Sequence, residues 1–340
     1  MNFSRKKGLL NFGRGKTVVE DYVIRVDTTQ TGSGTTTFIL PIFGTYDYRW
    51  EADLDPSVNG SGTGSGSKSF SFPSSGIYKI FIKGTGASIR IRFNDTGDKL
   101  KIIEILNWGT TPFYSFYGAY FGCENLVINA NDEIKLISGA SMYVAFNKVK
   151  TINTPLKFNS TSGTTNFDYM FSLCKGYNSS LDNFDLSSAI NVFSMFHDVQ
   201  YFNQSINGLD FSKATNLQNL LTYVSTFNKD VDITISNCTS IANTFLSTNI
   251  QSIILRDCSN VTTIGVPSFP ITVKTLLLYG LAQNFYIYTY PSLTGVDIDN
   301  LALSVADLTS KPSKSVRMSV AQKASCDNSL WTNKNWTITT

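Results

Sequence analysis

Residues 167–191 read FDYMFSLCKGYNSSLDNFDLSSAIN, and residues 192–216 read VFSMFHDVQYFNQSINGLDFSKATN. The two stretches align without a gap, so that Met170-Phe171 lies over Met195-Phe196. The step of 25 residues extends through one apolar column: Phe121, Phe146, Phe171, Phe196, Leu221 and, one residue early, Phe245. A fixed period of about 20–50 residues is typical of stacked arrays, and it therefore predicts a solenoid.

Each repeat also carries two apolar residues two positions apart, which is the spacing of a short strand that buries one face. The pairs are Phe184/Leu186, Leu209/Phe211, Ile233/Ile235, Ile253/Leu255, Leu276/Leu278 and Val296/Ile298. Such strands would stack as a parallel ladder around a continuous core. A column of Asn191, Asn216, Ser240 and Asn260 is placed to bond the backbone of neighbouring turns. We expect a parallel β solenoid over residues 115–340, with six clear turns and weaker turns before them.

The end of the chain carries the pattern of a last repeat and then of a cap. Residues 293–303, LTGVDIDNLAL, match the leucine-rich signature L-x-x-L-x-L-x-N. An open end of a solenoid exposes apolar core and unpaired backbone, so a cap is required. We assign the cap to residues 313–340, where Trp331 and Trp336 would seal the core.

The first third of the chain alternates short strand patterns with turns. The strand-like segments are residues 23–26, 36–40, 46–50, 70–72, 77–83 and 88–93. Between them, NGSGTGSGSKS (59–69) lacks the Lys-Ser/Thr ending of a phosphate loop, and we interpret it as a flexible hairpin loop. These strands predict a mostly β chain with a small immunoglobulin-like β-sandwich over residues 23–112 and the solenoid over residues 113–312.

The composition favours a structural or binding protein over an enzyme. Charged residues make up 16% of the 340 residues, against about 25% in an average soluble domain. The single histidine, His197, disfavours histidine-based metal sites and catalysis. Asp297 and Asp299 have the spacing of a carboxylate pair on one strand face, but such pairs on solenoid strands are usually solvated. We therefore expect no catalytic residue, no metal and no cofactor, and the five cysteines without a C-x-x-C pair should be buried thiols.

The first sixteen residues carry the positive balance of the chain. They hold +5 and no acid, so the other residues sum to −2 within a net charge of +3. A disordered tail, a nucleic-acid arm and a docking peptide are three interpretations, and the interleaved apolar residues favour docking onto another protein. Residues 1–22 would form this arm, with contacts from Phe3, Arg5, Lys6, Lys7, Leu9, Leu10, Phe12, Arg14 and Lys16. The start lacks the apolar region of a signal peptide, and no apolar run suits a membrane span.

Several motifs resemble the BspA-like leucine-rich-repeat family, whose repeats follow MF…FNQ.I..WD.S.vtN. Met195-Phe196, residues 202–206 (FNQSI), Asp210, Ser212 and Asn216 reproduce that pattern. Further family motifs, including A-F-x-G-C-x-N-L and a closing K-G-W-T-I, have counterparts at residues 76–80, 108–109, 119–126 and 331–338. The resemblance covers residues 36–340 and implies a leucine-rich-repeat solenoid. The family's acidic W-G-D-G turn is missing at residues 46–53, as is the secretion signal of its cell-surface members.

These features favour a non-enzymatic bacteriophage virion protein, a tail, tail-fibre or capsid-fibre subunit assembled in the host cytoplasm. The alternative is a bacterial cell-surface adhesin with leucine-rich repeats. We expect a homo-oligomer that binds other virion proteins through residues 1–22 and a host-surface glycan or protein through its repeats, with no nucleic-acid or membrane partner. The outward strand positions form the candidate binding face: Asp185, Asp210, Thr234, Ile254, Arg256, Leu277, Tyr279 and Asp297.

Overall fold

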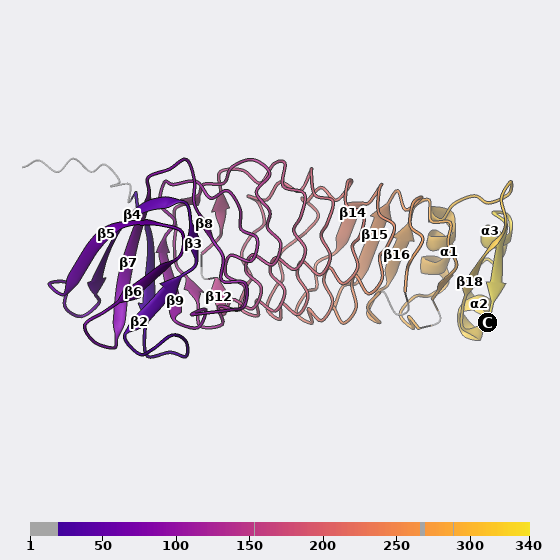
Figure 1. Cartoon of the computed structure of the whole chain (residues 1–340). Coiled ribbons are helices and arrows are strands. Elements are labelled where there is room, and N and C mark those ends of the chain that lie inside the picture. Colours follow the sequence, from indigo (N-terminus) through magenta and orange to yellow (C-terminus); the bar gives the residue numbers. More distant parts are fainter. Residues whose placement is uncertain (1–19, 153, 266–268, 288) are drawn as a thin grey trace, which may run out of the picture.

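The protein is an elongated rod with one continuous core. The computed structural model describes residues 20–152, 154–265, 269–287 and 289–340. An antiparallel sheet forms one end, stacked coils form the middle, and helices α1 to α3 lie at the other end (Figure 1). A single cluster of buried apolar side chains runs from Tyr22 to Trp336. The chain is mostly β, with a solenoid of about 10 turns. The predicted docking contacts, from Phe3 to Lys16, lie outside the described residues.

The N-terminal sheet continues directly into the solenoid. Its seven strands follow the order β12-β10-β9-β1-β7-β4-β5. The antiparallel members are β1 (Tyr22–Asp27), β4 (Thr45–Ala52), β5 (Asn59–Ser65), β7 (Ile77–Gly84) and β9 (Ile102–Asn107). The strands β10 (Val127–Ile128) and β12 (Thr151–Ile152) then add in parallel to β9, so the first coils extend the sheet.

Two short antiparallel pairs accompany this sheet. They are β2 (Thr37–Leu40) with β6 (Lys68–Ser71), and β3 (Ile42–Phe43) with β8 (Arg90–Ile91). Aromatic rings of these strands pack against the large sheet. The Phe70 ring of β6 meets the Tyr48 ring of β4 edge to face, with centroids 5.2 Å apart. The six predicted strand segments are all present, although residues 88–93 contain only the two-residue β8. The immunoglobulin-like arrangement itself is not confirmed by this topology.

The glycine-rich segment forms the edge strand β5, so the prediction of a flexible loop is wrong. β5 pairs with β4 in a register that places glycines opposite aromatic residues: Gly60/Trp50, Gly62/Tyr48 and Gly64/Tyr46. A Cβ atom on Gly64 would fall 2.5 Å from the Tyr46 ring. Glycine is used here because the absent side chain makes room for the ring on the neighbouring strand.

Between residues 140 and 250 the coils stack through a repeated backbone turn. Two positions per coil adopt the left-handed conformation, with φ between 47° and 63°: Val144, Lys148, Tyr169, Leu173, Ser194, Asp198, Asn219, Tyr223, Asn243 and Ser247. The Tyr169 N–H donates to the Phe193 carbonyl of the next coil at 2.9 Å, whereas the Met170 N–H donates back to Phe167 within its own coil at 3.1 Å. This alternation satisfies the backbone without a regular strand.

Aromatic rings stack in two columns inside these coils. The first column consists of Tyr120, Phe146, Phe171 and Phe196, with neighbouring centroids 5.7–5.8 Å apart and planes within 12° of parallel. The second consists of Tyr177, Phe202 and Phe227, with centroids 5.9 Å apart. Phe121, the predicted first member, is only half-buried. The coil from Tyr120 to Phe146 is one residue longer than the others, so Tyr120 takes the inward position.

Regular parallel strands occur only in some of the coils. Besides β10 and β12, and the strands at the end of the rod, they are β11 (Glu133–Ile134) with β13 (Lys157–Phe158), and the ladder β14 (Val231–Thr234), β15 (Ser252–Arg256) and β16 (Thr275–Leu278). In that ladder the predicted inward residues, such as Ile253 and Leu255, are fully buried. The pairs Phe184/Leu186 and Leu209/Phe211 are buried too, but in coils without a regular strand. The prediction of one strand in every repeat is therefore wrong.

The prediction of a last leucine-rich repeat at the end of the rod is wrong. Residues 293–303 contain the helix α1 (Gly295–Ser304) instead of a strand, because Thr294 and Asp297 form a capping box and Ile298, Leu301 and Ala302 bury one helical face. Val296 is 72% exposed. The strand β17 (Phe285–Tyr286) precedes α1 in the chain and pairs in parallel with β18 (Lys314–Arg317), which pairs in parallel with β19 (Trp336–Thr339). The helices α2 (Val320–Ser325) and α3 (Ser329–Thr332) belong to the same end of the rod. Trp331 and Trp336 are buried there.

The predicted asparagine column exists in part. Single backbone bridges link Asn166, Asn191, Asn216, Ser240 and Thr263 in successive coils. The Asn216 side chain accepts from the Gln218 N–H at 2.9 Å and so closes a turn in its own coil. Asn260 lies outside the column, and its Nδ2 donates to the Ser236 carbonyl of the previous coil at 2.6 Å. Within this column the main chain makes the bridges between coils, whereas Asn260 links two coils through its side chain.

Candidate binding surfaces

The predicted binding face is assembled around Arg256. The parallel register of β14, β15 and β16 places Asp232 beside Ile254, and Ile254 beside Leu277. The Arg256 guanidinium bonds the Asp232 carboxylate through Nε and Nη2, each at 2.7 Å, and lies 5.7 Å from the centre of the Tyr279 ring. These hydrogen bonds hold the pKa of Asp232 below its ordinary value. Ile254 and Leu277 are half-buried beside this ion pair, so the face has an apolar centre and a charged edge.

Asp210, Thr234 and Asp185 are further members of the predicted face. Asp210 and Thr234 line a hollow of about 350 Å³ together with Arg256. Hydrogen bonds from Ser187 hold the pKa of Asp185 below its ordinary value, because the hydroxyl and the N–H both stabilise the carboxylate. Each acidic residue here therefore already has a partner in its own coil or in the next one.

Asp297 does not belong to this face. It is the third residue of α1, and its carboxylate accepts from the Thr294 N–H at 3.1 Å and from the Thr294 hydroxyl at 2.9 Å. Asp299 accepts from the Asp327 N–H at 2.7 Å. On a helix, residues two apart do not face each other. The predicted placement of both carboxylates on one strand face is therefore wrong.

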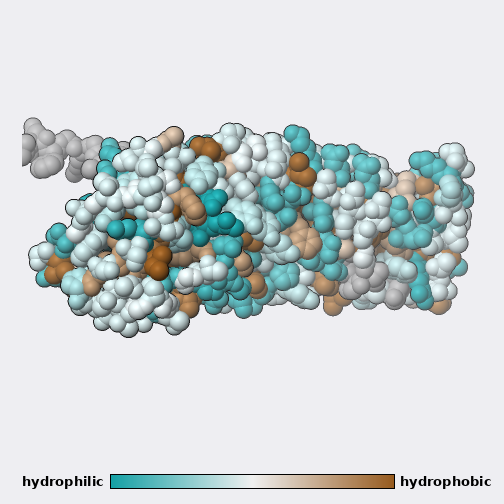
Figure 2. Space-filling view, viewed as in Figure 1, coloured by the Kyte–Doolittle hydropathy of each residue, from teal (hydrophilic) through white to brown (hydrophobic). Residues whose placement is uncertain are grey.

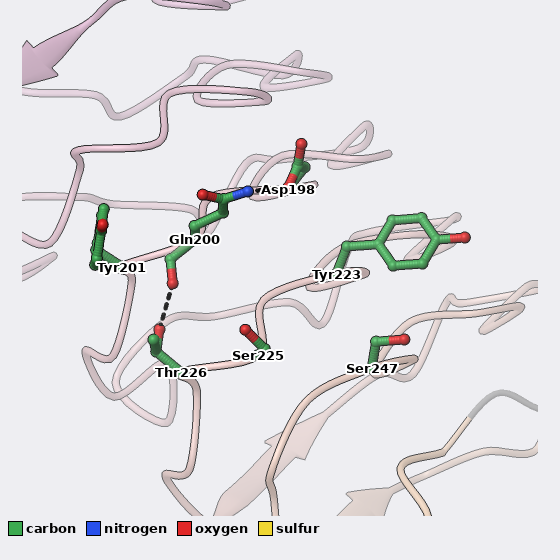
Figure 3. Close-up of a pocket in the computed structure, with 7 residues that line it drawn as sticks. All are labelled: Asp198, Gln200, Tyr201, Tyr223, Ser225, Thr226 and Ser247. Carbon is green, nitrogen blue, oxygen red and sulfur yellow. Dashed lines mark hydrogen bonds between the residues drawn. The ribbon is translucent and has the colours of Figure 1, made fainter.

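A second surface feature is a hollow of about 590 Å³ that spans three coils (Figure 3). Its lining comes from equivalent turns of successive coils: Asp198, Gln200, Tyr201, Tyr223, Ser225, Thr226 and Ser247. Tyr201 and Tyr223 lie at opposite ends, with Gln200, Ser225 and Thr226 between them (Figure 3). We call this hollow the tyrosine groove. Its aromatic ends are exposed, at 64% for Tyr201 and 52% for Tyr223.

Hydrogen bonds between successive coils fix the backbone of the tyrosine groove. The Thr226 hydroxyl donates to the Gln200 carbonyl at 2.7 Å and ties two coils together at the base of the groove. Asp198 and Tyr223 occupy equivalent left-handed positions of successive coils, and their N–H groups bond the coil that follows at 2.9 Å. The side chains of the groove therefore project from a backbone that the solenoid fixes.

His197 supports one end of the tyrosine groove. Its ring meets the Tyr223 ring edge to face, with centroids 5.6 Å apart. Burial lowers the pKa of His197, and the neighbouring Asp198 carboxylate opposes that shift. The imidazole is half-buried in a turn.

The surface of the rod is mixed in polarity. On the face shown in Figure 2, apolar residues are scattered among polar ones along the rod. Among the described residues, no group of three or more His, Cys, Asp or Glu side chains is placed to hold a metal ion. None of the described helices is long and apolar enough to span a bilayer. The five cysteines are free thiols, and four of them are buried.

The comparison with protein families gives a match to part of the chain. A family model described as "Mycoplasma protein of unknown function, DUF285" matches residues 140–255. Searches of curated proteins and of solved structures found no match. The family match and the solenoid fit a BspA-like repeat protein. The matched segment contains most of the aromatic columns and the whole tyrosine groove.

Sequence reasoning missed the tyrosine groove. Residues 176, 201 and 226 are equivalent in three successive repeats and read Gly, Tyr and Thr. Residues 173, 198 and 223 read Leu, Asp and Tyr. An aromatic residue at a repeat position that is not aromatic in the two other repeats is the signal that could have revealed both tyrosines.

Proposed function

We propose that this chain is a non-enzymatic bacteriophage virion protein, a tail, tail-fibre or capsid-fibre subunit that presents its solenoid to a host surface or a neighbouring subunit. The observation that carries this proposal is that the inward and outward positions of each coil hold different kinds of residue. Inward positions are taken by stacked rings and aliphatic residues, whereas outward positions hold uncharged polar residues, tyrosines and partnered acids. A rigid rod with a long and varied surface suits binding.

The charge distribution supports attachment to a particle. Residues 1–16 hold +5, while the rest of the chain sums to −2. We propose that the segment before β1 docks onto another virion protein and that the rods form a homo-oligomer. The predicted end of the arm at residue 22 is too late, because Tyr22 begins β1 and is buried in the core. Electrostatic attraction would steer the basic arm to an acidic partner surface and raise the rate of assembly.

A bacterial cell-surface adhesin is the second candidate. The match to a family described from Mycoplasma favours it, because that description refers to a bacterial protein. Both candidates use the solenoid as a binding surface, and they differ in what the rod is attached to.

Fractionation of a producing culture tests both candidates. Particles purified on a density gradient and cell envelopes would each be analysed by quantitative mass spectrometry. A fixed ratio of this protein to the major capsid protein is expected for a virion subunit, and presence in the envelope alone would replace that proposal by the adhesin. Absence from both fractions would overturn both.

Two variants test the attachment scheme. Deletion of residues 1–16 should leave the solenoid folded but remove the protein from particles, whereas normal incorporation would refute docking by the arm. Leu277→Asp changes a half-buried residue on the outer strand face. It should weaken host attachment or assembly with little change in Tm, and unchanged attachment and assembly would remove that face from the proposal.

A further inference from the structure

We propose that the tyrosine groove binds a neutral saccharide. This inference rests on the proposed function of a surface-binding rod and names the ligand class of one site on it. The groove is separate from the strand face around Arg256, because its lining comes from other parts of the coils.

The aromatic ends supply the apolar part of saccharide recognition. A sugar ring presents C–H groups on one face and hydroxyls at its rim. Tyr201 and Tyr223 each expose more than half of their surface, and their polar tips allow the rings to stay in water until a ligand covers them. Two exposed rings at the two ends of one hollow can each cover the face of a different sugar unit in the same chain.

The base of the groove supplies the polar part. Gln200, Ser225 and Ser247 offer an amide and two hydroxyls that can donate and accept, as the hydroxyls of a sugar require. Within the part of the chain that the structure describes, the Asp198 carboxylate has only a long hydrogen bond from Gln200 Nε2, at 3.5 Å. It can therefore accept from a ligand hydroxyl, and such charge-assisted bonds are about twice as strong as neutral ones.

The charge of the groove selects against acidic ligands. Asp198 is the one charged residue among those that line it. An acidic sugar, a phosphate or a sulfate would meet a carboxylate and no cation, and like charges disfavour binding. The volume of about 590 Å³ lies within the range of about 300–1,000 Å³ for small-ligand pockets. The ligand class is therefore a short neutral segment of a glycan.

The test measures saccharide binding by the purified full chain. Linear hexasaccharides of glucose, galactose, mannose and N-acetylglucosamine would be titrated by calorimetry, with hexagalacturonate as an acidic comparison. We expect at least one neutral hexasaccharide to bind and the acidic one not to bind. Failure of every neutral probe, or preference for the acidic one, would overturn the inference.

Variants then locate the site. Tyr201→Ala and Tyr223→Ala should each weaken binding at least tenfold, which corresponds to about 1.4 kcal/mol. Tyr201→Phe keeps the ring and should weaken it less, and Asp198→Asn should weaken it several-fold. Tyr117→Ala is the matched control, because Tyr117 is 37% exposed and lies in another coil. Binding that survives the Tyr201→Ala/Tyr223→Ala double variant would overturn the inference.

The outcome is independent of where the rod is attached. A chain found in particles that binds no neutral probe would retain the proposed function and lose the groove. A chain absent from particles and envelopes that still binds a saccharide through both tyrosines would retain the groove and lose the proposed function. Both exposed tyrosines can be removed with little effect on folding, so Tm should stay nearly constant in these variants.

Discussion

Replacing Gly64 by alanine tests whether strand β5 is shaped by the aromatic rings of β4. Tyr46, opposite Gly64, is 1% exposed, and its hydroxyl donates to the Gly66 carbonyl at 2.7 Å. The ring is therefore held along its whole length. An alanine Cβ would fall 2.5 Å from this ring, whereas carbon atoms pack at about 3.5–4.0 Å. Either the two strands separate locally or the ring moves and its hydrogen bond breaks.

The expected cost of Gly64→Ala follows from two opposing effects. Overpacking of a closely packed site costs about 1–3 kcal/mol, while replacement of a strand glycine by alanine otherwise gains about 0.5–1 kcal/mol. We expect a net loss of about 1–2 kcal/mol in the free energy of unfolding. With about 2.1 cal/mol/K of unfolding entropy per residue, a cooperative chain of this length would lose about 1–3 °C in Tm.

Scanning calorimetry of the full chain measures this change, and two glycines serve as controls. Gly208→Ala adds its Cβ where no atom lies within 4 Å, so Tm should stay constant or rise. Gly62→Ala should cost less than Gly64→Ala, because the nearest atom is the hydroxyl at the far end of the half-buried Tyr48 side chain. A rise in Tm for Gly64→Ala would show that residues 59–65 behave as a flexible loop and that the pairing described here is wrong.

Three further substitutions probe the core and the buried charges. Phe196→Ala removes a fully buried ring from the first column and should cost about 3–5 kcal/mol in urea unfolding; a cost below about 1 kcal/mol would mean that the column is not core. Lys101→Met should cost about 3 kcal/mol or more, because the buried ammonium donates to three carbonyls of residues 33–37 at 2.6–2.7 Å, and an unchanged urea midpoint would contradict this role. Burial raises the pKa of Asp168 despite a 2.7 Å bond from the Phe193 N–H, so the folded state loses stability as pH rises through that pKa. Asp168→Asn should therefore raise Tm at pH 7 and lose this advantage below about pH 4, and an equal gain at both pH values would argue against a titrating carboxylate.

The periodic core could be predicted because it depends on side-chain volume at fixed intervals. Phe171 and Phe196 were placed in one column from their 25-residue spacing, and their rings stack at 5.7 Å. The inside and outside of β15 were also predicted correctly, since Ile253 and Leu255 are buried and Ile254 is half-buried. In each case the spacing of apolar residues in the sequence was enough to predict which side chains are buried.

Backbone conformation was harder to predict than burial. A strand and a chain of left-handed turns can both bury alternate residues, so Phe184 and Leu186 carry no signal that separates them. Val296 and Ile298 fitted a strand, but the spacing of Ile298, Leu301 and Ala302 fits a helix equally well. Short apolar patterns leave this choice open, and here the capping box at Thr294 decided it.

The candidate surfaces show the same limit. Arg256, Leu277 and Tyr279 were assigned to one face from strand alternation, and the register brings them together. Asp297 was assigned to that face only because its segment was taken as a strand. The tyrosine groove was missed because the turns of three coils contribute its lining. Predicting that these turns lie together requires knowing which residues adopt the left-handed conformation.

The architecture explains how a binding surface can arise without a cost to folding. Each coil contacts mainly its two neighbours, so stability depends on the inward column and on the backbone bonds between coils. Residues 176, 201 and 226 share one outward position, yet they read Gly, Tyr and Thr, while the adjacent inward residues Tyr177, Phe202 and Phe227 remain stacked at 5.9 Å. The outward side chain thus differs from coil to coil while the inward one keeps the coil in register, although at Gly176 a Cβ atom would fall 2.9 Å from the Lys150 carbonyl oxygen. Because Phe202 directly follows Tyr201, the backbone that carries the ring that would meet a ligand is anchored by a ring of the core.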